Sequence, residues 1–216
     1  MPVAVKICGL TSAAAIDAAI GAGAVYGGLV FHPQSPRFVT PDLARMLADR
    51  MRGHLKSVAL IADLDDARIG EVVKMAQPDF LQLHGQETVK RTAEIRGRFG
   101  LPVIKALPVA EPSDFDVVAA YEANADMLLF DARPPKGAER GGGHGAAFDW
   151  KLLAGRTFAK PWFLAGGLTQ DNVARAIALS GAQMVDVSSG VESAPGVKDA
   201  AKITAFVEAT RMPVRA

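Results

Sequence analysis

The chain has 216 residues, with 24 Lys or Arg against 23 Asp or Glu and a formal net charge of +1 at pH 7. This balance excludes the basic surface typical of nucleic-acid-binding domains, so we expect no nucleic-acid partner. The length favours one domain over 1–216 with a substantial core. Cys8 is the only cysteine, which excludes an intrachain disulfide and fits a reducing compartment.

The first residues lack the charged segment of a secretory signal, and Lys6 interrupts their apolar run. The apolar stretch 13–31 is long enough to raise the question of a membrane span. Asp17 and four glycines within it favour a short helix, a turn and a strand instead. We therefore expect a cytoplasmic protein that does not contact a membrane.

Short apolar runs alternate with helix-like stretches along the whole chain. The predicted strands are 3–8, 25–31, 57–62, 80–84, 103–107, 127–131, 162–165 and 184–188. The predicted helices are 12–22, 41–52, 65–76, 87–98, 113–123, 149–154, 170–180 and 198–210. Eight such units predict an α/β fold, a single (β/α)8 barrel, because parallel strands need helical crossovers. A doubly wound open sheet uses the same units and is the alternative fold.

Reactive side chains stand at the C-terminal ends of these strands, the face of a barrel where catalysis occurs. Side chains two residues apart in a strand share a face, so Cys8, His84, Asp131 and Ser188 should converge at the barrel mouth. Cys8 is a candidate base or nucleophile, and Lys6 on the same face is in place to lower its pKa. The alternative for Cys8 is a small buried hydrophobe.

Asp131 ends an apolar run, which predicts a raised carboxyl pKa and a general acid opposite Cys8. The alternative is a carboxylate that only caps the next loop. His84 is a candidate substrate ligand, or a structural histidine. Arg37 offers a planar fork suited to a carboxylate, with an ordinary surface arginine as the alternative. No set of Cys, His and carboxylates has metal-ligand spacing, so we expect no metal.

Two glycine-bearing loops follow the seventh and eighth predicted strands. Backbone N–H groups in these two loops bind phosphate in many barrels, so we predict a phosphate site here. The residues predicted to bind substrate in or beside these loops are Gly166, Gly167, Asp186, Ser188, Ser189 and Gly190.

Taken together, these segments resemble the phosphoribosylanthranilate isomerases of tryptophan biosynthesis. The matching segments run along the whole chain, at 6–11, 31–37, 81–85, 129–131, 148–150, 164–168 and 186–192, with Gly196, Lys198 and Asp199 after them. One loop departs from the pattern: where the family usually has Gly-Gly-Thr-Gly-Lys, the stretch from Gly142 to Ala146 reads Gly-Gly-His-Gly-Ala.

The resemblance implies the Amadori rearrangement of N-(5-phosphoribosyl)anthranilate to 1-(2-carboxyphenylamino)-1-deoxyribulose 5-phosphate, without a cofactor. It also implies that Asp131 protonates the ribose ring oxygen, that the Cys8 thiolate removes the C2′ proton and that Arg37 holds the anthranilate carboxylate. The small-molecule partner is therefore a phosphosugar, and either a monomer or a homodimer is consistent with the family. Two other functions stay open, an isomerase of histidine biosynthesis acting on a similar aminoaldose and a noncatalytic phosphosugar-binding barrel.

Overall fold

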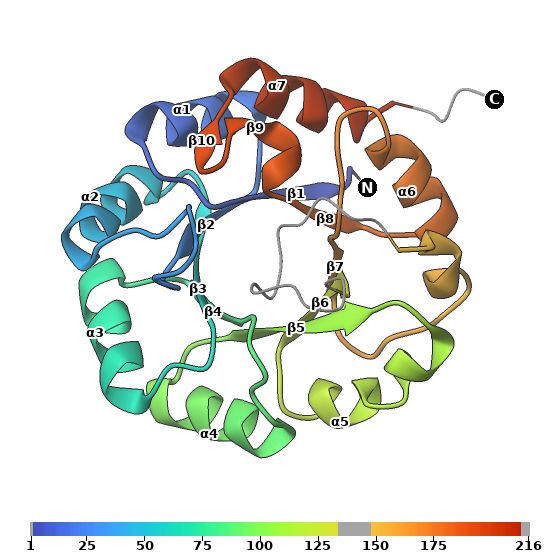
Figure 1. The fold of residues 1–216 in the computed structure, drawn as a ribbon, viewed down its shortest axis with the longest axis horizontal. Helices are drawn as coiled ribbons and strands as arrows, with labels where there is room; N and C mark the ends of the chain where they lie inside the picture. The colour runs from blue at the N-terminus through green and yellow to red at the C-terminus, as the bar shows by residue number, and fades with distance from the viewer. Residues whose placement is uncertain (1, 134–147, 213–216) are drawn as a thin grey trace.

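The computed structural model describes residues 2–133 and 148–212. Eight parallel strands close into a barrel in chain order, surrounded by helices (Figure 1). The strands are β1 Ala4–Cys8, β2 Tyr26–Val30, β3 Lys56–Ile61, β4 Phe80–Leu83, β5 Val103–Val109, β6 Met127–Ala132, β7 Trp162–Leu164 and β8 Met184–Val187. The (β/α)8 prediction is confirmed. The open-sheet alternative is wrong, because β1 pairs with both β2 and β8 and leaves no edge.

The helices follow the strands as predicted, with the bounds α1 Ala13–Ala22, α2 Pro41–Met51, α3 Asp66–Ala76, α4 Val89–Phe99, α5 Val118–Glu122, α6 Val173–Ser180 and α7 Ala200–Ala209. Side-chain caps explain several starts: Ser12, Thr40, Asp65 and Thr88 each accept a backbone N–H of the first turn. Within the described residues, no helix is long and apolar enough to cross a membrane.

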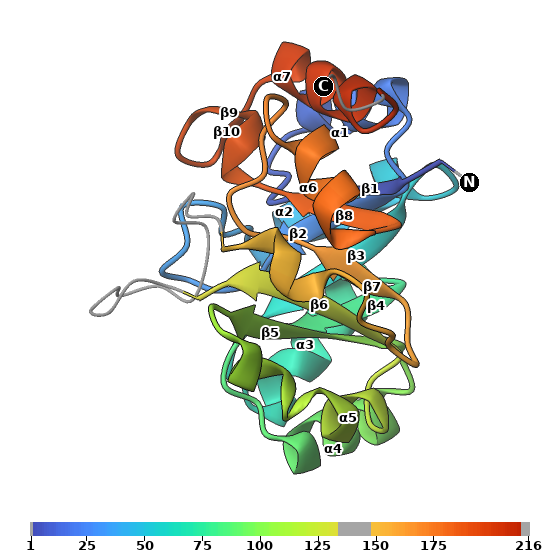
Figure 2. The same ribbon diagram turned by 90° about the vertical axis from the view of Figure 1, so that its right-hand side faces the viewer.

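Three segments differ from the expected helices and loops. The helix predicted over 113–123 divides into a 3-10 turn, η1 Pro112–Phe115, and the short α5, while 149–154 contains only the 3-10 turn η2 Trp150–Leu153. After β8 comes another such turn, η3 Ser189–Val191, and then an unpredicted hairpin of β9 Glu192–Ala194 and β10 Val197–Lys198. In Figure 2 this hairpin lies on the side of the molecule opposite the N-terminus.

The strands bury both of their faces. Along β6, Leu128 and Phe130 pack in the large apolar layer between barrel and helices, whereas Met127 and Leu129 belong to the smaller cluster inside the barrel. The period of two residues then directs Asp131 inward as well, at the C-terminal end of the strand. The core therefore positions this carboxylate at the barrel mouth.

A buried ion pair fixes the loop between β4 and α4. The Lys105 ammonium on β5 donates to Glu87 Oε2 at 2.7 Å and to the carbonyl of Gly85 at 2.8 Å, and both charged side chains are 3% exposed. Glu87 also accepts the backbone N–H groups of Asp63 and Gly85 at 2.8 and 3.0 Å. These contacts hold the chain just beyond His84, so they support the barrel mouth directly.

We expect Lys105→Met to lower the free energy of unfolding by about 3–5 kcal/mol, because it leaves the Glu87 carboxylate buried without its cation. Urea denaturation followed by circular dichroism measures this loss. Lys90→Met is the matched control, since Lys90 is 88% exposed and its pairing with Glu94 is long, at 3.9 Å. Equal effects of the two substitutions would show that the buried pair has no special part in stability.

Candidate active site

A cavity opens at the C-terminal ends of the barrel strands. Six of the predicted site residues line it together, namely Cys8, Arg37, His84, Asp131, Asp186 and Ser188. The convergence expected from strand periodicity is therefore present for Cys8, His84, Asp131 and Ser188. The other four predicted residues, Gly166, Gly167, Ser189 and Gly190, are in the loops after β7 and β8 and are absent from the described lining of the cavity.

Cys8 ends β1 and is only 4% exposed. Its neighbour on β2 is Gly28, at which an added Cβ would lie 3.1 Å from Cys8 Sγ and 3.4 Å from Lys6 Cε. Lys6 and Cys8 thus share the inner face, as the alternation predicted. Burial raises the pKa of the Cys8 thiol above its ordinary value, with Lys6 and Lys198 opposing and Asp186 adding to the rise. The expected lowering by Lys6 is therefore outweighed by burial, and the net direction is the reverse of the prediction.

Lys6 is fully buried and donates to Asp186 Oδ1 at 2.9 Å. Burial favours the neutral amine, but the pairing with Asp186 and the nearby Cys8 raise the pKa of Lys6 above its ordinary value. Lys6 therefore stays an ammonium beneath the thiol. Asp186, predicted to bind substrate, lines the cavity with one oxygen already engaged by this cation.

The carboxylate of Asp131 lies across the cavity in contact with His84. Its Oδ1 accepts the N–H of Ala132 at 2.8 Å, and its Oδ2 lies 3.4 Å from His84 Nε2. The other ring nitrogen of His84, Nδ1, lies 3.0 Å from the amide nitrogen of the fully buried Gln82. The two ring nitrogens of His84 thus contact Gln82 on one side and Asp131 on the other. Gln82 was not predicted as a site residue, although its spacing of two from His84 indicated a shared face.

Arg37 is not an ordinary surface arginine, because its side chain is only 12% exposed. Its Nε and Nη2 donate to the two oxygens of Glu192 at 2.7 and 2.9 Å, a bidentate pair. The chain passes beneath this side chain at Gly9, where φ is +77° and any Cβ would collide with Arg37 Cδ. Glycine at this position thus makes room for the arginine.

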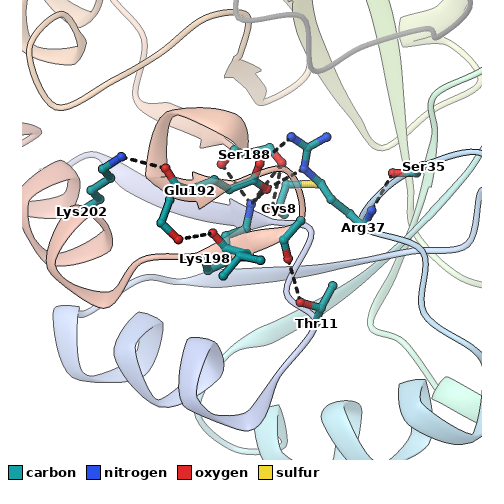
Figure 3. Close-up of polar contacts among 11 residues, drawn as sticks. Cys8, Thr11, Ser35, Arg37, Ser188, Glu192, Lys198 and Lys202 are labelled. Carbon is teal, nitrogen blue, oxygen red and sulfur yellow. Dashed lines mark hydrogen bonds and ion pairs between the residues drawn. The ribbon is translucent and has the colours of Figure 1, made fainter.

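Sequence reasoning missed the partner network of Arg37, drawn in Figure 3. Glu192 Oε1 also accepts from Lys198 at 2.7 Å, and Lys198 donates to the carbonyl and hydroxyl of Ser188 at 2.9 and 3.2 Å. Ser188 in turn donates its hydroxyl to the carbonyl of Cys8 at 3.0 Å. The only signal in the sequence was the position of Glu192 and Lys198 in family-like segments. Nothing in the sequence indicated that Glu192 and Lys198 lie near Cys8.

The two glycine-bearing loops approach their neighbours closely. Gly166 has φ of +87°, and a Cβ there would lie 2.6 Å from the nitrogen of Ala132, next to Asp131. A Cβ on Gly190 would collide with the carbonyl of Leu168, so the loops after β7 and β8 touch. For the backbone N–H groups of Gly166, Gly167, Ser189 and Gly190, no acceptor is found among residues 2–133 and 148–212.

Two further expectations from the sequence concern the variant glycine-rich stretch and a metal site. The variant stretch from Gly142 to Ala146 lies outside the described residues. Among the residues that are described, no group of three or more His, Cys, Asp or Glu side chains is arranged to hold a metal ion.

Comparison with known proteins identifies the family. Residues 5–209 match the sequence model of N-(5′-phosphoribosyl)anthranilate isomerases. The isomerase of that name from Paramagnetospirillum magneticum is 54% identical over 211 residues, 98% of each chain. Phosphoribosyl anthranilate isomerase from Thermotoga maritima superposes with a TM-score of 0.86 at 33% identity, covering 97% of this chain and 98% of that one. With the same coverage, a phosphoribosyl anthranilate isomerase bound to reduced 1-(o-carboxyphenylamino)-1-deoxyribulose 5-phosphate gives a TM-score of 0.82 at 30% identity. The chain therefore belongs to the N-(5′-phosphoribosyl)anthranilate isomerase family.

Proposed function

We propose that this chain catalyses the Amadori rearrangement of N-(5-phosphoribosyl)anthranilate to 1-(2-carboxyphenylamino)-1-deoxyribulose 5-phosphate, a step of tryptophan biosynthesis. The observation that carries this proposal is the placement of Cys8, Asp131 and Arg37 around one cavity. A base, an acid and a carboxylate-binding cation are the groups that this reaction requires. The substrate itself is taken from the family, one member of which binds a reduced form of this product.

In the first step, Asp131 acts as the general acid. Its proton passes to the ring oxygen of the ribose as the bond from that oxygen to C1′ breaks. The lone pair of the anthranilate nitrogen forms a double bond to C1′, which gives an open-chain Schiff base and leaves Asp131 as a carboxylate. The resulting carboxylate faces His84 at Oδ2 and accepts the N–H of Ala132 at Oδ1.

In the second step, the Cys8 thiolate takes the proton from C2′. The electrons of that bond form a C1′–C2′ double bond and neutralise the cationic nitrogen, so an enolamine results. The enolamine then tautomerises: C1′ gains a proton and the C2′ hydroxyl loses one, which gives the ketone. The anthranilate nitrogen supplies the imine in this sequence, and the proposal therefore includes no cofactor.

Substrate binding is assigned to two anionic ends. Glu192 occupies Nε and Nη2 of Arg37, whereas Nη1 has no protein acceptor within residues 2–133 and 148–212, and we assign it to the anthranilate carboxylate. The backbone N–H groups of Gly166, Gly167, Ser189 and Gly190, which have no acceptor within residues 2–133 and 148–212, are assigned to the phosphate. The hydroxyl of Ser188 is already engaged. The single domain over 1–216, the cytoplasmic location and the monomer or homodimer stay predictions.

Cys8→Ala should lower kcat by on the order of 10²–10⁴-fold, because no base remains at C2′. The loss of fluorescence of freshly made phosphoribosylanthranilate measures turnover. The reduced product analogue should still bind, since alanine removes only the sulfur. A folded Cys8→Ala protein with undiminished kcat would exclude the thiolate mechanism. A separate assay of the parent protein with the aminoaldose of histidine biosynthesis tests that alternative activity.

Asp131→Asn should reduce turnover by a comparable factor, about 10²–10⁴-fold, because an amide cannot deliver the proton that opens the ring. Asp171→Asn removes an exposed carboxylate and is the matched control. Both proteins are compared with the parent by single-turnover kinetics, which separates chemistry from product release. If Asp131→Asn behaves like the control, the acid must be another group, and His84 would be the next residue to replace.

Gly190→Ala should raise KM by about tenfold or more with a smaller effect on kcat, because its methyl group separates the two loops and misaligns their N–H groups. Gly97→Ala is the control, since a Cβ at Gly97 meets nothing within 4 Å. Steady-state kinetics and competition by the reduced product analogue give the comparison. An unchanged KM in the folded Gly190→Ala protein would place the phosphate elsewhere.

A further inference from the structure

We propose that Lys198 is a positioning residue for the catalytic thiol: its buried ammonium anchors the chain after β8 to the Cys8 backbone and offsets the charge of the thiolate. The inference rests on the proposed role of Cys8 as the base. It concerns a side chain that lines no part of the cavity in the described structure and that acts through its neighbours.

The position of Lys198 is fixed by three acceptors. Its side chain is 0% exposed, and Nζ lies 2.7 Å from Glu192 Oε1, 2.9 Å from the Ser188 carbonyl and 3.2 Å from Ser188 Oγ. An ammonium has three N–H groups, so none remains for a ligand. The hydroxyl of Ser188 in turn donates a hydrogen bond to the carbonyl of Cys8 (Figure 3). Lys198 therefore links the hairpin to the end of β1 through buried hydrogen bonds.

The hairpin that carries Lys198 is itself held against the barrel mouth. Thr11 donates to the carbonyl of Gly196 at 3.1 Å, and Lys202 donates to the carbonyl of Glu192 at 2.8 Å. Gly196 has φ of +82°, and a Cβ there would collide with the carbonyl of Pro36. The turn thus packs directly on the chain that leads to Arg37, and Lys198 has little freedom to move away from Cys8.

The charges around Cys8 leave one positive charge unmatched. Lys6 pairs with Asp186, and Glu192 is shared between Arg37 and Lys198, so three cations face two carboxylates on this wall. Across the cavity stand Asp131 and His84, which contact each other, and the lining also includes His32 and Asp63. A buried charge without a partner is costly, and ionisation of the Cys8 thiol supplies the missing negative charge.

The electrostatic influences on Cys8 agree with this account. Burial, the largest of them, raises the pKa of the thiol, whereas the ammonium groups of Lys6 and Lys198 lower it. Reciprocally, the pKa of Lys198 lies below its ordinary value, first because of burial and also because of Arg37, while Glu192 and Cys8 oppose this shift. Cys8 and Lys198 therefore stabilise each other's charged forms. Lys6 is the stronger cation acting on the thiol, but Asp186 opposes it, so Lys198 adds positive charge that Lys6 and its partner do not supply.

The test uses the fact that Cys8 is the only cysteine, so the ultraviolet absorbance of the thiolate reports on this residue once the tyrosinate signal of Tyr26 and Tyr121, measured in Cys8→Ala, is subtracted. Lys198→Met keeps the stem volume but removes the charge, and the midpoint of the Cys8 titration should rise by about one pH unit or more. The acid limb of kcat/KM should move upward with it, because the base is active only when ionised. Lys90→Met, which removes an ammonium that is 88% exposed on α4, is the matched control and should leave the midpoint in place.

A second pair of variants keeps the proposal testable if Lys198→Met fails to fold. Adding Lys198→Met to Glu192→Gln removes both partners, and the midpoint should then lie above that of Glu192→Gln alone, because one positive charge is lost. An unchanged midpoint in folded Lys198→Met, or an equal rise in Lys90→Met, overturns the proposal. So does a double variant whose midpoint equals that of Glu192→Gln. The titration needs no turnover, so an active Cys8→Ala protein would refute the proposed base without altering this result.

Discussion

The pairing of β8 with β1 is the constraint on which the active site depends. It closes the barrel and sets Lys6 opposite Asp186, where the two side chains form a buried ion pair. Because side chains alternate along each strand, the same register brings Cys8 and Ser188 to the mouth together, each two residues further on. The hydrogen bond between Ser188 and the Cys8 carbonyl then ties these two strand ends. One backbone register thereby places the proposed base, the buried ammonium of Lys6 and the start of the proposed phosphate loop.

Burial has two opposing consequences for Cys8. It removes water from the thiolate, which raises the thiol pKa, and it strengthens the field of any charge nearby. A base with a raised pKa is stronger but is ionised less at neutral pH, so its rate contribution depends on the cations that recover the ionised fraction. Lys6 lowers the thiol pKa most, but its partner Asp186 raises it, so Lys6 supplies this only in part. Lys198, which donates to Ser188, is therefore proposed to favour ionisation of Cys8 as well as to hold the loop in place.

Much of this arrangement could be predicted from the sequence, because local patterns determine it. Strand alternation gave the inward direction of Lys6, Cys8 and Asp131, and the number of units gave the barrel. Contacts between distant segments could not be predicted: Arg37 and Glu192 are 155 positions apart, and no local pattern joins them. The reversed pKa shift of Cys8 has the same origin, since the sequence shows the nearby Lys6 but not the burial around the thiol. The hairpin was missed because its strands have only three and two residues.

Glu192 connects the two ends of the proposed chemistry. One of its oxygens accepts from both Arg37 and Lys198, and the other accepts from Arg37 alone. Its double pairing keeps the pKa of the Glu192 carboxyl below the ordinary value, although burial opposes this. The carboxylate thus orients Arg37 with Nη1 left for the anthranilate group while it holds Lys198 beside Ser188. A substrate carboxylate on Nη1 would bind the same guanidinium that Glu192 holds at Nε and Nη2. Glu192 therefore links the arginine proposed to bind the substrate carboxylate with the lysine beside Ser188 and Cys8.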